Sequence, residues 1–265
     1  MALVHCMYYS EILRRDSAFY ALLPERMDMR PDTEPRPGNR YQVLYLLHGL
    51  RSDASSWFRK TAMPELYTQE YQLIVILPDA ACNFYADMAY GDAYFSLVAE
   101  EIPRVAGAWF PISKKREDTF VAGLSMGGYG ALKLALRRPE RYAAALSLSG
   151  ALDIQSAVDF ALGEKNFPLR PELVYKDPAH LRGSDEDLFA LVKQADKAAL
   201  PALKLYCGEQ DGFLQTNQAF AALCAAEGIR VPLTVSPGGH DWGYWDMVLQ
   251  QMLKDLPLKG NPNAG

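Results

Sequence analysis

The feature that most constrains this chain is the segment Gly123-Leu124-Ser125-Met126-Gly127, which lies between an apolar run and a helical pattern. The apolar run predicts a buried strand, and residues 126–138 predict a helix that Pro139 ends. Serine between two glycines at such a junction is typical of a nucleophile elbow, where a strained turn projects the hydroxyl from the sheet. Glycines allow the strand and helix to approach closely, and the helix N-terminus directs free N–H groups at an oxyanion.

The segment alone would also fit an ordinary glycine-rich turn in which Ser125 only caps the helix, so the rest of the chain has to decide. With 265 residues, of which 49% are hydrophobic, the chain is long enough for one large core. We therefore predict a single domain over residues 1–265.

Apolar runs alternate with helical patterns along the chain, which predicts a mainly parallel sheet of about eight strands covered by helices on both faces. Besides the run before Ser125, strands are expected at residues 2–9, 17–23, 41–47, 73–77, 141–149, 203–207 and 231–235. Further helices are expected at residues 94–108, 219–228 and 242–256, with a surface loop at 30–40 and a loose tail at 257–265. Within the helix at 94–108 we expect a kink at Pro103 and a polar face that carries Glu100 and Glu101.

Residues 151–200 depart from this alternation, because about fifty residues with several prolines separate two strands. A segment this long inside a compact domain is usually functional. We predict that it is an inserted cap of mixed helix and loop over the site. The acidic run Asp185-Glu186-Asp187 is expected on its solvated face.

A serine hydroxyl needs a base to become a good nucleophile, and ligands of parallel sheets bind beyond the carboxyl ends of the strands. His240 follows the last expected strand in a glycine-rich loop, which makes it the candidate base. Asp211 follows the preceding strand and is the candidate carboxylate that orients the imidazole, with Asp153 as the alternative. The order Ser125, Asp211, His240 is that of the α/β-hydrolases.

Acyl transfer also needs two backbone donors for the developing oxyanion. The N–H of Met126, directly after the nucleophile, is the first candidate. The N–H of Leu50 is the second, because it follows His48-Gly49 at the end of another expected strand. We expect His48 to act on the backbone of this loop and not as the base.

Charge and cysteine content exclude several other classes of protein. A net charge of −5 gives no basic surface for nucleic acid or an anionic membrane. No apolar stretch approaches the roughly 20 residues of a membrane span, and no signal peptide is visible. The four cysteines lie far apart, which indicates neither a zinc site nor a disulfide framework and fits a reducing cytoplasm. We expect a soluble cytoplasmic protein without a metal site.

Three stretches together resemble the esterase D-like family of α/β-hydrolases: residues 47–50 (Leu-His-Gly-Leu), residues 123–131 and residues 238–245. The resemblance covers most of the chain and is strongest to the branch of small bacterial tributyrin and cinnamoyl esterases. It implies a serine carboxylesterase, often dimeric and without a metal or cofactor, that hydrolyses short-chain acyl or aryl esters such as acetyl, butyryl, cinnamoyl or feruloyl esters. The catalytic residues it implies are Ser125, Asp211 and His240, with Leu50 and Met126 as the oxyanion donors.

The same family contains S-formylglutathione hydrolases and, more remotely, mycolyltransferases, so a thioesterase or acyltransferase is the alternative. The formylglutathione hydrolases usually carry His where this chain has Tyr129, which favours the oxygen-ester reaction. A non-catalytic binding module on the same fold is a further rival. It is disfavoured because all three members of the expected triad are present.

Four aromatic residues near the expected strand ends are candidates for lining an apolar acyl or aryl pocket, with ordinary packing as the alternative for each. They are Trp57, Tyr85, Tyr90 and Phe213.

Overall fold

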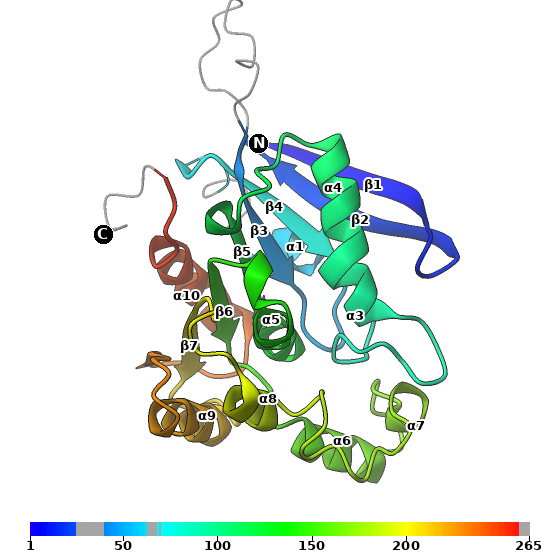
Figure 1. Ribbon diagram of the computed structural model, residues 1–265, viewed down its shortest axis with the longest axis vertical. Helices are drawn as coiled ribbons and strands as arrows, with labels where there is room; N and C mark the ends of the chain where they lie inside the picture. Colours follow the sequence, from blue (N-terminus) through cyan, green and yellow to red (C-terminus); the bar gives the residue numbers. More distant parts are fainter. Residues whose placement is uncertain (25–39, 63–67, 69, 260–265) are drawn as a thin grey trace, which may run out of the picture.

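The computed structural model describes residues 1–24, 40–62, 68 and 70–259. Within these residues, strands form one eight-stranded sheet of order β1-β2-β4-β3-β5-β6-β7-β8 (Figure 1). The strands are β1 (Ala2–Ser10), β2 (Arg15–Leu23), β3 (Gln42–Leu47), β4 (Leu73–Pro78), β5 (Thr119–Leu124), β6 (Ala144–Leu148), β7 (Ala202–Gly208) and β8 (Leu233–Ser236). The helices are α1 (Ser56–Lys60), α3 (Tyr94–Ser96), α4 (Ile102–Trp109), α5 (Met126–Arg137), α6 (Ile154–Gly163), α7 (Pro171–Val174), α8 (Leu188–Gln194), α9 (Leu214–Ala226) and α10 (Trp242–Lys254).

The sheet confirms the predicted, mainly parallel α/β architecture. β1 and β2 form an antiparallel hairpin, and β2 pairs antiparallel with β4. From β4 to β8 every neighbouring pair is parallel. The carboxyl ends of β3, β5, β7 and β8 therefore meet at one edge, and all the predicted catalytic residues follow one of these strands.

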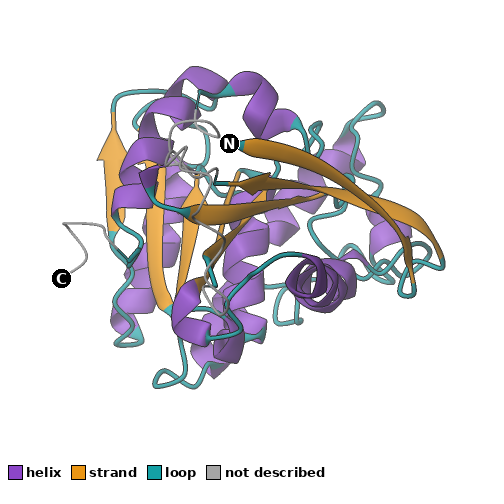
Figure 2. Ribbon diagram, turned by 90° about the horizontal axis from the view of Figure 1, so that it is seen from above, coloured by secondary structure: helices purple, strands orange, loops and turns teal. Residues whose placement is uncertain are grey.

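Helices cover both faces of the sheet, as the view from above shows (Figure 2). Alternate residues of β3 point into two separate cores: Val43 and Tyr45 into one, and Leu44 and Leu46 into the other. Every residue of β3 is buried, which explains why its sequence reads as one continuous apolar run. None of the described helices is long and apolar enough to cross a bilayer.

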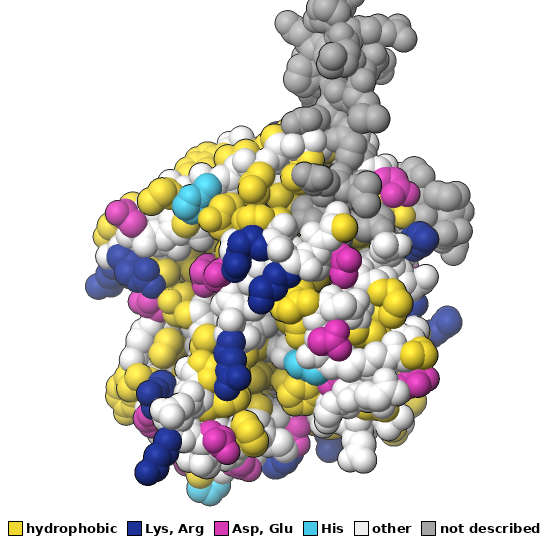
Figure 3. Space-filling model, turned by 180° about the vertical axis from the view of Figure 1, so that it is seen from behind, with side chains coloured by type: hydrophobic (Ala, Val, Ile, Leu, Met, Phe, Trp, Pro, Cys, Tyr) yellow, Lys and Arg dark blue, Asp and Glu magenta, His cyan; other side chains and the backbone are white. Residues whose placement is uncertain are grey.

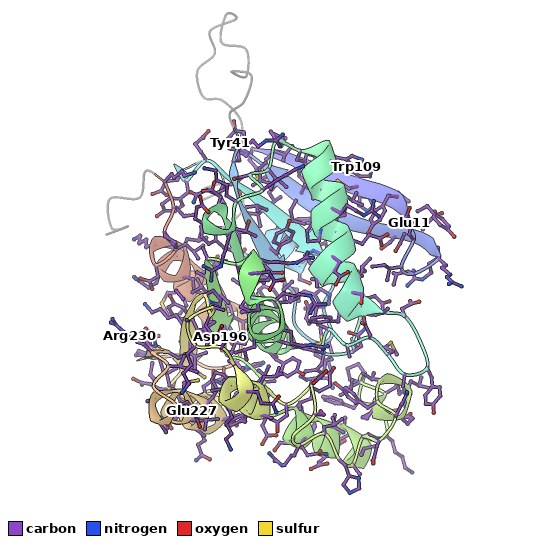
Figure 4. The ribbon with its side chains drawn as sticks, in the orientation of Figure 1. Glu11, Tyr41, Trp109, Asp196, Glu227 and Arg230 are labelled. Carbon is purple, nitrogen blue, oxygen red and sulfur yellow. The ribbon has the colours of Figure 1, made fainter. Side chains whose placement is uncertain are left out.

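The helix expected at 94–108 is interrupted by a π-helical turn at Leu97–Glu101. Pro103 lies two residues after this turn and lacks an N–H, so it cannot donate to the Ala99 carbonyl one helical turn earlier. The Arg141 guanidinium donates to that carbonyl instead. The expectation that Glu101 lies on a polar face is wrong, because this residue is only 2% exposed. The tip of the β1–β2 hairpin, marked by Glu11 in Figure 4, covers it: the Ser10 hydroxyl and the Glu11 N–H both donate to its carboxylate.

The predicted loose tail is also wrong for residues 257–259. Leu258 is buried, and the side-chain amide of Gln42 donates to the Pro257 carbonyl and accepts from the Lys259 N–H. The Lys259 ammonium lies 2.6 Å from the Asp118 carboxylate. Residues 260–265 and all but residue 40 of the loop expected at 30–40 lie outside the described residues.

Residues 151–200 contain α6, α7 and α8 joined by loops, the mixture of helix and loop that the sequence predicts (Figure 1). We call them the cap segment. The acidic run in it is not a solvated face, because only Asp185 is well exposed. Asp187 caps α8 by accepting from the Phe189 N–H, and Glu186 turns inward onto α5. Sequence alone does not reveal this, since the cation that Glu186 meets is buried on a distant helix.

Candidate active site

Ser125 occupies the turn between β5 and α5 with φ 55° and ψ −117°. A positive φ is strained for any residue with a Cβ, and such strain is typical of a nucleophile elbow. The two flanking glycines are needed sterically. A Cβ on Gly123 would lie 2.4 Å from the Gly127 carbonyl oxygen, and one on Gly127 would lie 2.5 Å from the Leu47 carbonyl oxygen. The strand–turn–helix geometry predicted from the sequence is therefore present.

Three side chains from three strand ends meet in a line of hydrogen bonds. The His240 Nε2 atom lies 3.0 Å from the Ser125 hydroxyl, and its Nδ1 atom lies 3.0 Å from the Asp211 carboxylate. Asp211 is buried, whereas the His240 side chain is 33% exposed. The imidazole thus stands between a buried carboxylate and the opening of the site. This is the geometry of a serine activated by an oriented base.

The Asp211 carboxylate has other hydrogen-bond partners besides His240. Its Oδ1 atom accepts from the Phe213 N–H at 2.9 Å, and the Ser149 hydroxyl donates to it as well. Trp245 in turn donates its indole N–H to the Ser149 oxygen at 3.1 Å. Burial alone would raise the pKa of Asp211, but the hydrogen bonds from His240, Ser149 and the Phe213 N–H outweigh it and lower this pKa. Asp211 is therefore an anion at neutral pH.

The structure rules out Asp153 as the partner of His240. Its carboxylate caps α6 by accepting from the Ser156 N–H at 3.1 Å and forms an ion pair with Arg182 at 3.1 Å. Asp153 lies between β6 and α6, and its carboxylate caps the N-terminus of α6.

Aromatic rings surround the imidazole. The rings of Phe213 and Trp245 lie edge-on to His240, with centroids 5.1 Å and 4.9 Å away. Trp242 packs on Trp245 in the same manner. Neither Ser149 nor Trp245 was a predicted site residue. Two signals point to Trp245: it lies in the first turn of α10, five residues after His240, and it ends the stretch 238–245 that carries the family resemblance.

The loop His48-Gly49-Leu50, which we call the oxyanion loop, passes directly beside Ser125. A Cβ on Gly49 would lie 3.4 Å from the Ser125 Cβ atom. His48 is buried; its Nε2 atom accepts the Ala80 N–H at 3.0 Å, which leaves Nδ1 to donate to the Gly49 carbonyl at 2.9 Å. The expectation that His48 serves the backbone of the loop is thus confirmed.

The bond from His48 also fixes the direction of the Leu50 amide. In a planar trans peptide the N–H points opposite to the carbonyl, so the Leu50 N–H points away from His48. Met126 is the first residue of α5, and its N–H has no acceptor within the helix. Met126 follows Ser125 in the chain, and Leu50 follows Gly49, which packs against Ser125. Their roles as oxyanion donors stay predictions.

Two of the four predicted substrate contacts are contradicted by burial. Trp57 and Tyr85 expose no surface. The Trp57 indole donates to the Leu47 carbonyl at 3.1 Å, and the Tyr85 hydroxyl donates to the His48 carbonyl at 2.8 Å. Buried backbone carbonyls need hydrogen-bond donors, and the two buried rings supply them at the end of β3.

The other two positions remain predictions. Phe213 lies beside His240, as described above. Tyr90 is 67% exposed, and its backbone N–H donates to the Leu173 carbonyl of the cap segment at 3.0 Å.

Comparisons with known proteins agree with this fold. A model of the family described as "Putative esterase" matches residues 10–256. An acetyl esterase of Caldicellulosiruptor saccharolyticus is 32% identical, over 93% of this chain and 94% of the relative. The solved structure of the fluorophosphonate-binding serine hydrolase FphF of Staphylococcus aureus is 31% identical with a TM-score of 0.88, over 97% of this chain and 99% of that one. The S-formylglutathione hydrolase FrmB of the same species is 31% identical with a TM-score of 0.81, over 95% and 97% of the two chains.

The fold and the site define a serine hydrolase of the α/β-hydrolase fold. The chain belongs to the esterase family that the model describes and is a carboxylic ester hydrolase.

Proposed function

We propose that this serine carboxylesterase hydrolyses short-chain acyl or aryl esters through an acyl-enzyme on Ser125. The observation that carries the proposal is the continuous line of hydrogen bonds from Asp211 through His240 to Ser125. Asp211 keeps the Nδ1 proton on His240, so Nε2 is free to accept the proton of the Ser125 hydroxyl. The hydroxyl oxygen then attacks the ester carbonyl.

The carbonyl oxygen becomes an oxyanion during this attack, and the N–H groups of Leu50 and Met126 are the donors we assign to it. His240 returns its proton to the departing alcohol. Water, activated by the same imidazole, then cleaves the acyl-enzyme and frees Ser125. We further propose that the chain is one catalytic domain and that the cap segment bounds the substrate site.

Relatives support the choice of acyl groups. One is an acetyl esterase, and a solved structure of a ferulic acid esterase is 25% identical with a TM-score of 0.78 over 95% of each chain. Phe213 beside His240 offers an aromatic edge to either kind of substrate. The alternative is an S-formylglutathione hydrolase, which the likeness to FrmB favours.

Turnover of an ester panel tests the proposal: p-nitrophenyl acetate, butyrate and octanoate, methyl ferulate and S-formylglutathione. We expect kcat/KM for acetate or butyrate, or for ferulate, to exceed that for octanoate by about tenfold or more, because each methylene that an acyl site cannot hold weakens binding of the transition state. Dominant turnover of S-formylglutathione would replace the proposal with the thioesterase alternative. No turnover of any oxygen ester would refute it.

We also propose that the protein is a homodimer that forms along β1. β1 is the edge strand of the sheet, and one of its faces exposes Leu3, Met7 and Tyr9, of which Met7 is 68% exposed. Hydrophobic side chains gather over this hairpin at the upper left of Figure 3. A long apolar edge strand is normally paired or covered, and a second copy of β1 would cover it.

Light scattering after gel filtration checks the dimer. We expect the wild-type chain to elute as a dimer and Met7→Asp to elute as a monomer, because a charge on the shared edge opposes pairing. Leu162→Asp, which charges an exposed apolar residue of α6, is the control and should stay dimeric. A monomeric wild-type protein would contradict the proposal.

A cytoplasmic location is our proposal as well. All four cysteines are free thiols, and three of them (Cys6, Cys207 and Cys224) are buried. Unpaired thiols are typical of a reducing compartment.

A further inference from the structure

Lys133 is a fully buried cation that the reaction itself does not use. It lies on α5, about two turns after Ser125, and its side chain has no exposed surface. A buried ammonium is costly unless its donors are satisfied. Lys133 is satisfied by two partners from distant parts of the chain: the Tyr85 carbonyl at 3.0 Å and the Glu186 carboxylate. Burial lowers the pKa of Lys133, and the contact with Glu186 opposes that shift.

Glu186 connects the cap segment to α5. Its backbone carbonyl accepts the Tyr129 hydroxyl at 2.6 Å, and its carboxylate lies 3.8 Å from the Arg137 guanidinium. Both Tyr129 and Arg137 belong to α5, as Lys133 does. The cap segment is therefore fastened to the helix that begins at the nucleophile, through a carboxylate whose side chain is only 17% exposed.

Tyr85 continues the connection toward the oxyanion loop. Phe84 and Tyr85 have φ angles of 54° and 51°, a strained conformation for two bulky residues in succession. Such a conformation persists only when its surroundings hold it, and here Lys133 holds the Tyr85 carbonyl while Asn83 accepts the Tyr85 N–H at 2.9 Å. The ring packs against Gly130, where a Cβ would lie 2.4 Å from it. Held in this way, the Tyr85 hydroxyl points at the His48 carbonyl.

We propose that Glu186, Lys133 and Tyr85 are positioning residues that hold the oxyanion loop over Ser125. The order of contacts is Glu186 to Lys133, Lys133 to the Tyr85 backbone, and the Tyr85 hydroxyl to the His48 carbonyl. Docking of the cap segment on α5 thereby sets the position of the Leu50 amide. The inference rests on the proposed function, because that function assigns the oxyanion to this amide.

The test measures kcat and KM on p-nitrophenyl acetate for Tyr85→Phe and Lys133→Met. We expect kcat to fall about tenfold or more in each variant and KM to stay within about twofold, because a misplaced donor weakens the transition state and not substrate binding. Matched controls are Tyr206→Phe and Lys204→Met. The Tyr206 hydroxyl and the Lys204 ammonium, both on β7, each donate to the carboxylate of Asp255, the residue that caps the C-terminus of α10. Their kcat should stay within about twofold of wild type.

A trifluoromethyl ketone separates positioning from a loss of stability. This inhibitor forms a hemiketal with the nucleophile, and its oxyanion needs the same donors as the transition state. Its inhibition constant should rise by the factor by which kcat falls in Tyr85→Phe. The double variant Tyr85→Phe/Lys133→Met should lose little more than the worse single variant, because the two residues act in one chain of contacts.

The outcomes distinguish this inference from the function on which it rests. If Tyr85→Phe keeps wild-type kcat and inhibition constant while Ser125→Ala is inactive, the relay is refuted and the proposed function stands. If Ser125→Ala remains active, the proposed function itself fails. Tyr85→Phe removes one oxygen atom and leaves the ring in place, so the test does not depend on whether Lys133→Met folds. Fully additive losses in the double variant would also overturn the relay.

Discussion

Ser125→Ala should lower kcat on p-nitrophenyl acetate by up to about 10⁶-fold while the thermal unfolding midpoint stays close to that of wild type. The hydroxyl is the group that His240 contacts at 3.0 Å, and alanine leaves no atom to attack the ester. We expect the fold of the variant to be unchanged, because the strained turn depends on the space that the glycines on either side leave and not on the hydroxyl.

Ser147→Ala is the matched control for this variant. Ser147 is a buried serine of β6 whose hydroxyl has no hydrogen-bond partner among the described residues. Its removal should leave kcat within about twofold of wild type. A Ser125→Ala protein that kept a tenth of wild-type turnover would show that another residue is the nucleophile.

Asp211→Asn should lower kcat by about 10⁴-fold. The side-chain amide can donate where the carboxylate only accepts, so it favours the His240 tautomer that carries its proton on Nε2. That tautomer cannot accept the proton of Ser125. Steady-state kinetics on the same ester, with circular dichroism to confirm folding, measures the effect.

Asp153→Asn separates the role of the carboxylate at position 211 from a general effect of removing charge. Asp153 contacts Ser156 and Arg182, so this variant should lose some stability and keep kcat within about twofold of wild type. The opposite pattern, with Asp153→Asn inactive and Asp211→Asn nearly normal, would contradict the assignment of the orienting acid.

The sequence was enough to predict that Ser125, Asp211 and His240 lie together, for a simple physical reason. Parallel strands end at one edge of the sheet, so Ser125, Asp211 and His240, each placed after a strand, had to lie near one another. Strand spacing and chain order are local properties that a single sequence carries. The same reasoning predicted the oxyanion loop directly after β3 in the chain.

Residues whose partners are distant in the sequence could not be predicted in this way. Glu101 and Glu186 both looked like surface charges, because local periodicity does not show which groups are buried against them. Trp57 and Tyr85 lie near strand ends, as predicted, but the carbonyls they serve become visible only when the loop backbone is placed. The sequence favoured Asp211 over Asp153, and the structure places Asp211 beside His240 and Asp153 at the N-terminus of α6.

The most direct test of the central claim is the mass of the protein, and of its peptides, after treatment with a fluorophosphonate. Such reagents form a stable bond only with an activated serine. We predict one adduct per chain, on the peptide that contains Ser125, and a large loss of labelling in His240→Ala because that variant lacks the base. Labelling at another residue, or none in a protein that still hydrolyses esters, would contradict the acyl-enzyme on Ser125.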